Sequence, residues 1–301
     1  MALSYATVPS GVHDWPYVSR TFQALGHRFA VRTDDPELGG LVDTMYSSCA
    51  VTGEPDTMYS IVSGVIRDVD GGVYVDDDVA LPVYEPSWAA RYLTWHVNQE
   101  VIDRSSRYVL LHAGMVAWRG CGVVLPGRPE AGKTTLVAGL IRNGFGYVTD
   151  EAVAIDPVDL KVAPYPKPLS IDRGAWSVLP DFDPTAQGSD ARYHARQWHV
   201  NPATIWPNAI AGRTPVSVVA FPRFVAGADT MLEPITRAQA LVELARETFR
   251  FHEDGRRNLR ILGEVVGQVT CYRLVSGDLD EACALVRGAV GGEVASHKEE
   301  P

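Results

Sequence analysis

The alternation of apolar and polar positions in the first third of the chain predicts a small strand-rich module. Apolar residues recur at every second position in several short runs, and Asp/Gly clusters at residues 68–72 and 76–78 separate them. Period-two alternation bounded by such turns is typical of half-buried strands. The expected strands are residues 27–32, 57–66, 72–75 and 79–84.

A helical stripe follows this module and marks a domain boundary. The stripe is expected to face the core and consists of Trp88, Tyr92, Val97, Val101 and Ile102. Its spacing predicts a helix that starts near residues 86–87. We therefore place the boundary within residues 85–105. The expected division is a strand-rich N-terminal module at 1–95, a second domain at 96–291 and a charged tail at 292–301.

The second domain alternates short strands with helices and is predicted to be α/β. Strands are expected at residues 108–112 and 115–118, paired around a turn at 113–114, and at 122–125, 146–149, 152–155, 216–221 and 269–275. Helices are expected at residues 133–143, 238–249, 259–266 and 279–286. Residues 181–201 are polar and irregular, which predicts a mobile loop.

Composition and charge narrow the range of partners. Apolar residues make up 46% of the chain, so a sizeable core can be buried. The formal net charge of −10 argues against binding to nucleic acid or to an anionic membrane surface, because both require a basic face. The four scattered cysteines favour reduced thiols in a cytoplasmic protein. Neither a signal peptide nor an apolar run long enough to span a bilayer is evident.

One motif predicts specific chemistry, because residues 127–134 match the pattern G-x-x-x-x-G-K-[ST]. Glycines at its ends let the backbone curl so that amide groups point at phosphates, and the helix that follows adds its positive end. Lys133 would neutralise the β- and γ-phosphates, and the Thr134 hydroxyl would join the Mg²⁺ shell. We therefore expect ATP and Mg²⁺ as cofactors. The expected nucleotide-binding residues are Gly127, Arg128, Pro129, Glu130, Ala131, Gly132, Lys133, Thr134 and Thr135.

Two further features stand near this motif. Asp150 and Glu151 end a predicted strand, 17 residues after Lys133. A P-loop enzyme needs an acidic residue in this region to hold Mg²⁺ or to accept a hydroxyl proton, whereas an isolated pair is an ordinary acidic turn. His112 ends a strand before the motif, and the residues alone leave both a structural and a catalytic role open. Beside the two acids, the pKa of His112 is expected to rise.

These residues together resemble a known family. Leu111-His112-Ala-Gly, residues 122–127, Gly132-Lys-Thr and residues 144–151 are similar to the catalytic domain of HPr kinase/phosphorylase, and more closely to bacterial HPr-kinase-related proteins of peptide-modification and surface-polysaccharide settings. The resemblance implies a P-loop kinase domain with a mixed sheet, of the HPr kinase/PEP carboxykinase type. It also implies an active-site role for His112, Asp150 as proton acceptor, and Glu151 with Thr134 at the metal.

The C-terminal part adds a weaker resemblance. Residues 255–259, with the sequence Gly-Arg-Arg-Asn-Leu, are similar to the family's Gly-Arg-Asn-Leu run, which implies a catalytic role for Arg257; a solvated basic helix start is the alternative. The family's Glu-Ile-Arg-Gly signature has only a partial counterpart at residues 171–174. That difference predicts little or no reverse, phosphorylase-type reaction.

The leading hypothesis is a Mg·ATP-dependent kinase that phosphorylates a hydroxyl, most simply a serine, on a protein or peptide. An ATP-binding accessory protein and a kinase for a small metabolite or sugar are the alternatives. The acidic pair favours a kinase over a pure binder, since binding alone requires no base. A local basic stretch either stays solvated or receives an acidic or phosphorylated partner; it comprises Arg192, His194, Arg196 and His199. Homo-oligomerisation is left open.

Overall fold

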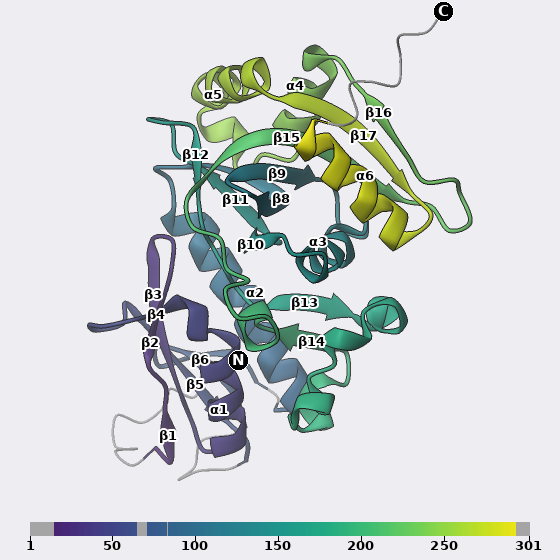
Figure 1. Cartoon of the computed structure of the whole chain (residues 1–301). Coiled ribbons are helices and arrows are strands. Elements are labelled where there is room, and N and C mark those ends of the chain that lie inside the picture. Colours follow the sequence, from purple (N-terminus) through teal and green to yellow (C-terminus); the bar gives the residue numbers. More distant parts are fainter. Residues whose placement is uncertain (1–14, 65–70, 83, 293–301) are drawn as a thin grey trace, which may run out of the picture. The chain divides into compact units, whose positions relative to one another are not determined.

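The computed structural model describes residues 15–64, 71–82 and 84–292, which form two compact units (Figure 1). The first unit combines the residues up to Arg104 with Lys167–Ile205, and the second combines Ser105–Pro166 with the residues from Trp206 onward. The structure thus differs from the expected contiguous division, because Lys167–Ile205 packs with the first unit. Residues 293–301 of the expected tail lie outside the described residues.

The first unit is built on one sheet that two helices cover. The strand order is β4-β2-β3-β5-β6-β7, with β1 paired to β3. Only the β3–β5 pairing is parallel among the described ladders of this sheet. The strands are β1 (Tyr17–Val18), β2 (Thr21–Ala24), β3 (His27–Thr33), β4 (Ala50–Val51), β5 (Thr57–Val62), β6 (Gly72–Val75) and β7 (Asp78–Leu81). The expected strand-rich module is confirmed, although residues 65–66 and 83 of two expected strands lie outside the described residues.

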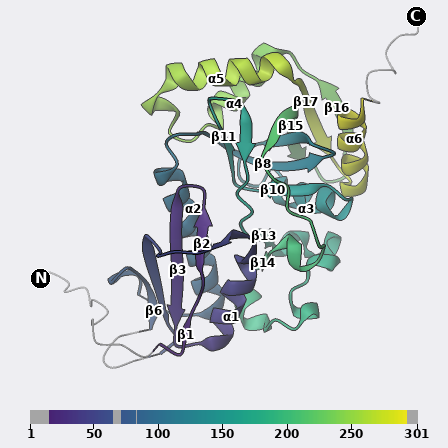
Figure 2. The same cartoon turned by 60° about the vertical axis from the view of Figure 1, so that its left-hand side comes forward.

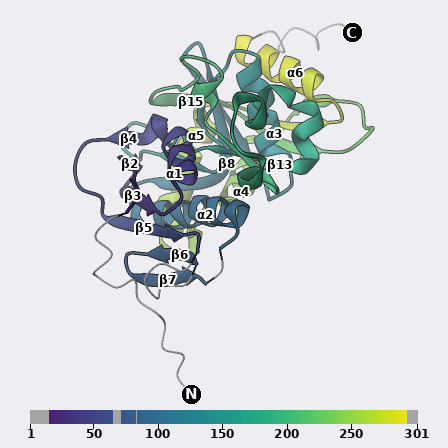
Figure 3. The ribbon, with the colours of Figure 1, turned by 90° about the horizontal axis from the view of Figure 1, so that it is seen from below.

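Helices α1 (Pro36–Met45) and α2 (Pro86–Arg104) lie beside each other against this sheet (Figure 3). The predicted helix at residue 86 is confirmed, but its apolar stripe is only partly right. Leu93 and Val97 are fully buried, whereas Trp88 is 42% exposed. The buried face of α2 is centred on small and aliphatic residues, and Trp88 lies at its margin, where a large ring reaches solvent.

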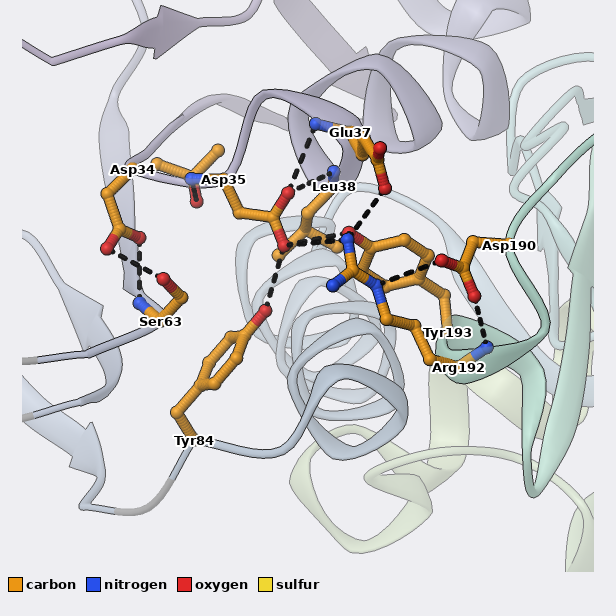
Figure 4. Close-up of polar contacts among 10 residues, drawn as sticks. Asp34, Asp35, Glu37, Leu38, Ser63, Tyr84, Asp190, Arg192 and Tyr193 are labelled. Atoms are coloured by element: carbon orange, nitrogen blue, oxygen red, sulfur yellow. Dashed lines mark hydrogen bonds and ion pairs between the residues drawn. The ribbon is translucent and has the colours of Figure 1, made fainter.

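A carboxylate explains how part of the distant segment joins the first unit (Figure 4). Asp35 caps α1 by accepting hydrogen bonds from the amides of Glu37 (3.1 Å) and Leu38 (3.2 Å). The same side chain accepts from the hydroxyls of Tyr84 (3.1 Å) and Tyr193 (2.7 Å). Burial alone would raise the pKa of Asp35, but these hydrogen bonds lower it overall. One ionised group thus ties three chain segments together.

Residues 181–201, expected to be an irregular loop, hold regular structure instead. Strands β13 (Leu169–Asp172) and β14 (Gln197–Val200) pair antiparallel, and short 3₁₀ helices fill the chain between them. Tyr193 and Trp198 are buried. The sequence of this segment has no helical or strand period, yet its aromatic residues are buried in the core of the first unit. Contacts with residues distant in the sequence determine this burial, and a local pattern does not reveal it.

The second unit holds a mixed sheet in which β9, β15 and β17 run parallel. The strands are β8 (Val109–Trp118), β9 (Cys121–Pro126), β10 (Gly146–Thr149), β11 (Ala152–Ile155), β12 (Lys161–Ala163), β15 (Thr214–Phe224), β16 (Met231–Pro234) and β17 (Thr270–Ser276). The helices are α3 (Lys133–Arg142), α4 (Arg237–Arg246), α5 (Gly255–Gln268) and α6 (Leu279–Gly291). The expected mixed α/β arrangement is confirmed.

Helices cover both faces of this sheet (Figure 2). One face packs on α4 and α5 through a core that includes Leu111, Leu244 and Ile261. The other carries α3 and α6. The turn expected at residues 113–114 is wrong, because β8 continues to Trp118. Gly114 instead permits close packing, since a Cβ there would lie 2.6 Å from a methyl group of Val137 in α3.

Among the described residues, no helix combines the length and apolar character that a bilayer crossing requires.

His27 makes the stability of the first unit sensitive to acid. It is 0% exposed, and among the described residues neither ring nitrogen has a hydrogen-bond partner. Burial, with a smaller effect of Arg104, lowers its pKa to about 4. An unfolded histidine titrates near pH 6.5, so between that pH and about 4 only the unfolded state gains the proton. We expect the free energy of unfolding to fall there by roughly 3 kcal/mol.

Urea unfolding followed across this pH range tests the expectation. His27→Leu should remove most of the loss between pH 6.5 and 4, whereas His252→Leu, at an exposed position, should not. Equal pH dependence in wild type and His27→Leu would contradict it.

Candidate active site

The loop between β9 and α3, which can be located in Figure 1, contains two residues in the left-handed region of backbone conformation. Gly132 has φ 86° and stands at the N-cap of α3, a left-handed conformation that glycine adopts without strain. Glu130 shares this region with φ 67° and is exposed. No side chain of the described residues caps the start of α3, so its first amides remain available to a ligand.

Lys133 is held inside the curl of this loop. It is 7% exposed, and its Nζ donates to the carbonyl oxygens of Gly127 (2.5 Å) and Arg128 (2.9 Å). Burial lowers the pKa of Lys133, while the carboxylates Glu151, Glu247 and Asp150 act in the opposite direction. The ammonium group therefore lies between the loop carbonyls and a group of acids, where an incoming phosphate would compete for it.

The structure brings the loop and the acidic pair together. Asp150 is 3% exposed at the end of β10 and accepts hydrogen bonds from the hydroxyls of Thr134 (3.2 Å) and Tyr147 (2.9 Å). A hydroxyl and a carboxylate are ligand types that suit Mg²⁺. Within the described part of the chain, no group of three or more His, Cys, Asp or Glu side chains could hold a metal ion. A cation here would therefore take most of its ligands from water and phosphate oxygens, as Mg²⁺ commonly does.

His112 lies between two carboxylates. Its Nε2 is 3.8 Å from Oε1 of Glu151, and its Nδ1 is 3.6 Å from Oε2 of Glu247. Its backbone amide also donates to the Glu247 carbonyl at 2.7 Å. Glu247 was not predicted from the sequence, because it follows α4 far along the chain and reaches β8 only through the bridge between Leu111 and Thr248.

The expected rise in the pKa of His112 is wrong. Burial lowers this pKa and Lys133 lowers it further, and together they outweigh Glu247 and Asp150, which raise it. The prediction counted the neighbouring acids but not the loss of water around the ring or the lysine beside it. His112 is thus disposed to be neutral at pH 7, with one ring nitrogen able to accept a hydrogen bond.

A hollow of about 560 Å³ opens beside the loop. Residues 126–131 line one side and 221–224 another, with Glu243, Arg246, Glu247 and Arg273 completing the wall. Its volume is in the range of small-molecule sites. Arg246 and Arg273 were not predicted, because neither belongs to a motif. The guanidinium of Arg273 forms an ion pair with the Glu243 carboxylate at 2.8 Å. Arg128 and Pro129, which belong to the predicted loop, are exposed.

The structure does not bring Arg257 to this site. Its guanidinium donates to the carbonyl oxygens of Ser106 (3.3 Å) and Arg107 (2.5 Å), just before β8. Arg107 precedes His112 by five residues. At about 3.3 Å per residue along an extended strand, this separation is roughly 16 Å.

Thr135 lies in the first turn of α3 and is partly buried.

Comparison with known proteins supports one resemblance over part of the chain. No family model matches it. HPr kinase/phosphorylase of Chlorobium chlorochromatii is 33% identical over 75 residues, which cover 25% of this chain and 22% of that protein. HPr kinase/phosphorylase of Chlorobium luteolum is 32% identical over 75 residues, covering 25% of this chain and 23% of that protein. Over that stretch the chain is HPr kinase/phosphorylase-like. The match spans less than a quarter of the length of either relative.

A solved structure, the Hpr(Ser) kinase/phosphatase from Coxiella burnetii, aligns with 62% of this chain and 96% of that chain. The identity is 11% and the TM-score is 0.34. The resemblance predicted from the sequence is nevertheless confirmed by the two HPr kinase/phosphorylase relatives.

Proposed function

We propose that this chain is a Mg·ATP-dependent kinase that transfers the γ-phosphoryl group to the hydroxyl group of a serine in a protein or peptide. The contact that supports this most strongly joins the Thr134 hydroxyl to the Asp150 carboxylate. It places a buried acid at the first turn of the helix behind the loop, where a phosphoryl group and its metal would lie. The names of the two relatives include the protein HPr, which favours a protein acceptor over a metabolite.

Each side chain has a role in this proposal. The loop amides and Lys133 bind and orient the phosphates. Thr134 and Glu151 would hold the metal, and Mg²⁺ bound with ATP would neutralise charge on the phosphates. Asp150 accepts the proton of the attacking hydroxyl, and the hydroxyls of Thr134 and Tyr147 fix its orientation. His112 lies between Glu151 and Glu247, where its ring can hydrogen-bond a carboxylate or the bound phosphate.

One observation favours a second candidate, an ATP-binding accessory protein without phosphoryl transfer. The guanidinium of Arg257 is bonded to the carbonyl oxygens of Ser106 and Arg107 and is not brought to the loop. An arginine near the γ-phosphate stabilises the charge of the transferring group, and a protein that only binds ATP does not need one.

The two candidates differ in how ADP formation responds to an acceptor. The kinase proposal expects ADP release to rise sharply when a serine-bearing peptide or protein is added with Mg·ATP, and to stay at the basal level with the serine replaced by alanine. Tight Mg·ATP binding with a basal rate that no hydroxyl acceptor increases would favour the accessory protein instead.

Glu247 is proposed as a positioning residue for His112. Its carboxylate and its carbonyl both contact that residue. Glu247→Gln keeps the size of the side chain and removes the charge, so we expect transfer at saturating ATP to slow by about ten-fold, the effect typical of losing an orienting partner. Mg·ATP affinity should change little, because Glu247 does not belong to the phosphate-binding loop.

Glu243→Gln is the matched control, since Glu243 lies one turn earlier on α4, lines the same hollow and loses the same charge. Equal rates for both variants, or a lower melting temperature of Glu247→Gln with normal transfer by its folded fraction, would exclude the positioning role.

A further inference from the structure

A hollow in the first unit combines arginines with an exposed tryptophan. Its volume is about 600 Å³, and it is lined by the start of α2 and by the ends of β13 and β14 that lie beside each other. We call its cationic part the arginine pocket, formed by Arg91, Arg173, Arg196 and Trp88. All four side chains are exposed.

The basic stretch expected at residues 192–199 is divided by the fold. Arg192 forms ion pairs with Glu37 (2.6 Å) and Asp190 (3.2 Å), so its charge is largely satisfied. His194 and His199 are buried, and burial lowers the pKa of both, that of His199 to about 3. Only Arg196 of this stretch therefore remains as an exposed, unpaired cation within the described residues.

Within the described part of the chain, the arginine pocket has no internal charge neutralisation: none of Arg91, Arg173 and Arg196 forms an ion pair. Two acids do line the hollow, but each already accepts hydrogen bonds from its neighbours. Glu85 accepts from Ser87 and from the amide of Trp88 at the start of α2, and Asp172 accepts from the side-chain amide of Gln197. The guanidinium donors thus remain available to an external oxyanion.

Trp88 organises two of these cations. The guanidinium carbon of Arg196 lies 4.6 Å from the centre of one Trp88 ring, and that of Arg91 lies 5.9 Å from it. Contact with an aromatic face orients a guanidinium without neutralising it, so the N–H groups keep their capacity for bidentate binding. Both arginines therefore flank one exposed indole surface.

We propose that the arginine pocket binds an acidic peptide segment. Three cations from separate elements match a row of carboxylates better than a single small anion, and the indole offers a surface for an apolar side chain between them. The chain as a whole has a net charge of −10, so a local cluster of unpaired arginines opposes the overall field and would attract acidic ligands to the pocket.

The inference deepens the proposed function, because the acidic segment would belong to the serine-bearing acceptor. Binding to the arginine pocket requires neither ATP nor transfer, so the two proposals can fail separately. Lys133→Ala is expected to bind the acidic peptide normally. Arg196→Gln is expected to bind Mg·ATP normally.

Fluorescence anisotropy of a labelled peptide with a run of glutamates tests the inference on the full chain, without nucleotide. We expect saturable binding that weakens with added salt. Arg91→Gln and Arg196→Gln should each weaken it about five-fold, the ratio that corresponds to one exposed charge pair. Arg28→Gln on β3 is the control, since it removes the same charge from the same unit outside the pocket.

The outcomes are distinct. Binding that drops in both pocket variants but not in Arg28→Gln, and that is lost with a glutamine version of the peptide, supports the inference. The inference is overturned if the glutamate and glutamine peptides bind equally well. It is also overturned if Arg91→Gln, Arg196→Gln and Arg28→Gln all bind the glutamate peptide with the same affinity. A phosphoserine peptide or inorganic phosphate that binds through Arg196 while the glutamate peptide does not would also overturn it, because the pocket would then be a phosphate site.

Discussion

Asp150→Asn is expected to leave Mg·ATP binding nearly intact and to slow phosphoryl transfer by about 10²–10⁴-fold, the usual contribution of a general base. The asparagine keeps the shape of the side chain. Its Oδ1 can accept a hydrogen bond from one of the Thr134 and Tyr147 hydroxyls, and its Nδ2 can donate to the oxygen of the other, so the fold should be preserved. It cannot take up the proton of an attacking hydroxyl. Single-turnover rates and calorimetric ATP affinities, measured on the same preparation, separate the two effects.

Glu151→Gln is the matched control for this prediction. Glu151 neighbours Asp150 in the chain, but its side chain is 33% exposed and faces His112 at 3.8 Å. We expect a smaller loss of rate and a larger requirement for Mg²⁺ from this variant. If Glu151→Gln abolishes transfer while Asp150→Asn remains nearly normal, the two acids have exchanged the roles proposed for them.

Lys133→Ala is expected to weaken Mg·ATP binding by about 100-fold and to abolish measurable transfer. The ammonium group is buried within the loop and bonded to two loop carbonyls, so no other lysine can replace it. A charge-assisted hydrogen bond to phosphate contributes roughly 1.5–3 kcal/mol, which gives this order of loss.

Lys161→Ala removes the same charge from an exposed position on β12 in the same unit and should bind ATP as wild type does. Unchanged ATP affinity and turnover in Lys133→Ala would refute the assignment of the loop. A parallel loss in both lysine variants would point to a general electrostatic effect instead.

Local sequence patterns predicted most elements of the fold. Alternation marked β3 and β6, and the helical period marked α2, α3 and α4, because these patterns follow from burying one face of a regular element. The loop before α3 and the acids after β10 were also evident from spacing, and the structure places Thr134 beside Asp150.

Features that depend on distant contacts could not be predicted. Glu247 has no motif, and only the pairing of Leu111 with Thr248 brings it to His112. The segment Lys167–Ile205 joins the first unit through buried aromatic residues and through the hydrogen bond from Tyr193 to Asp35, and no sequence period marks either contact. The pKa of His112 required knowledge of burial, since charge alone gave the wrong direction.

The most direct test of the central claim follows the γ-phosphoryl group itself. The 301-residue chain is incubated with γ-labelled ATP, Mg²⁺ and a serine-bearing protein or peptide acceptor, and the labelled residue is identified by mass spectrometry. We predict label on a serine of the acceptor, none on its serine-to-alanine counterpart, and almost none when Asp150→Asn replaces wild type. Label that appears only as inorganic phosphate, or that reaches the serine equally well with Asp150→Asn, would contradict the account.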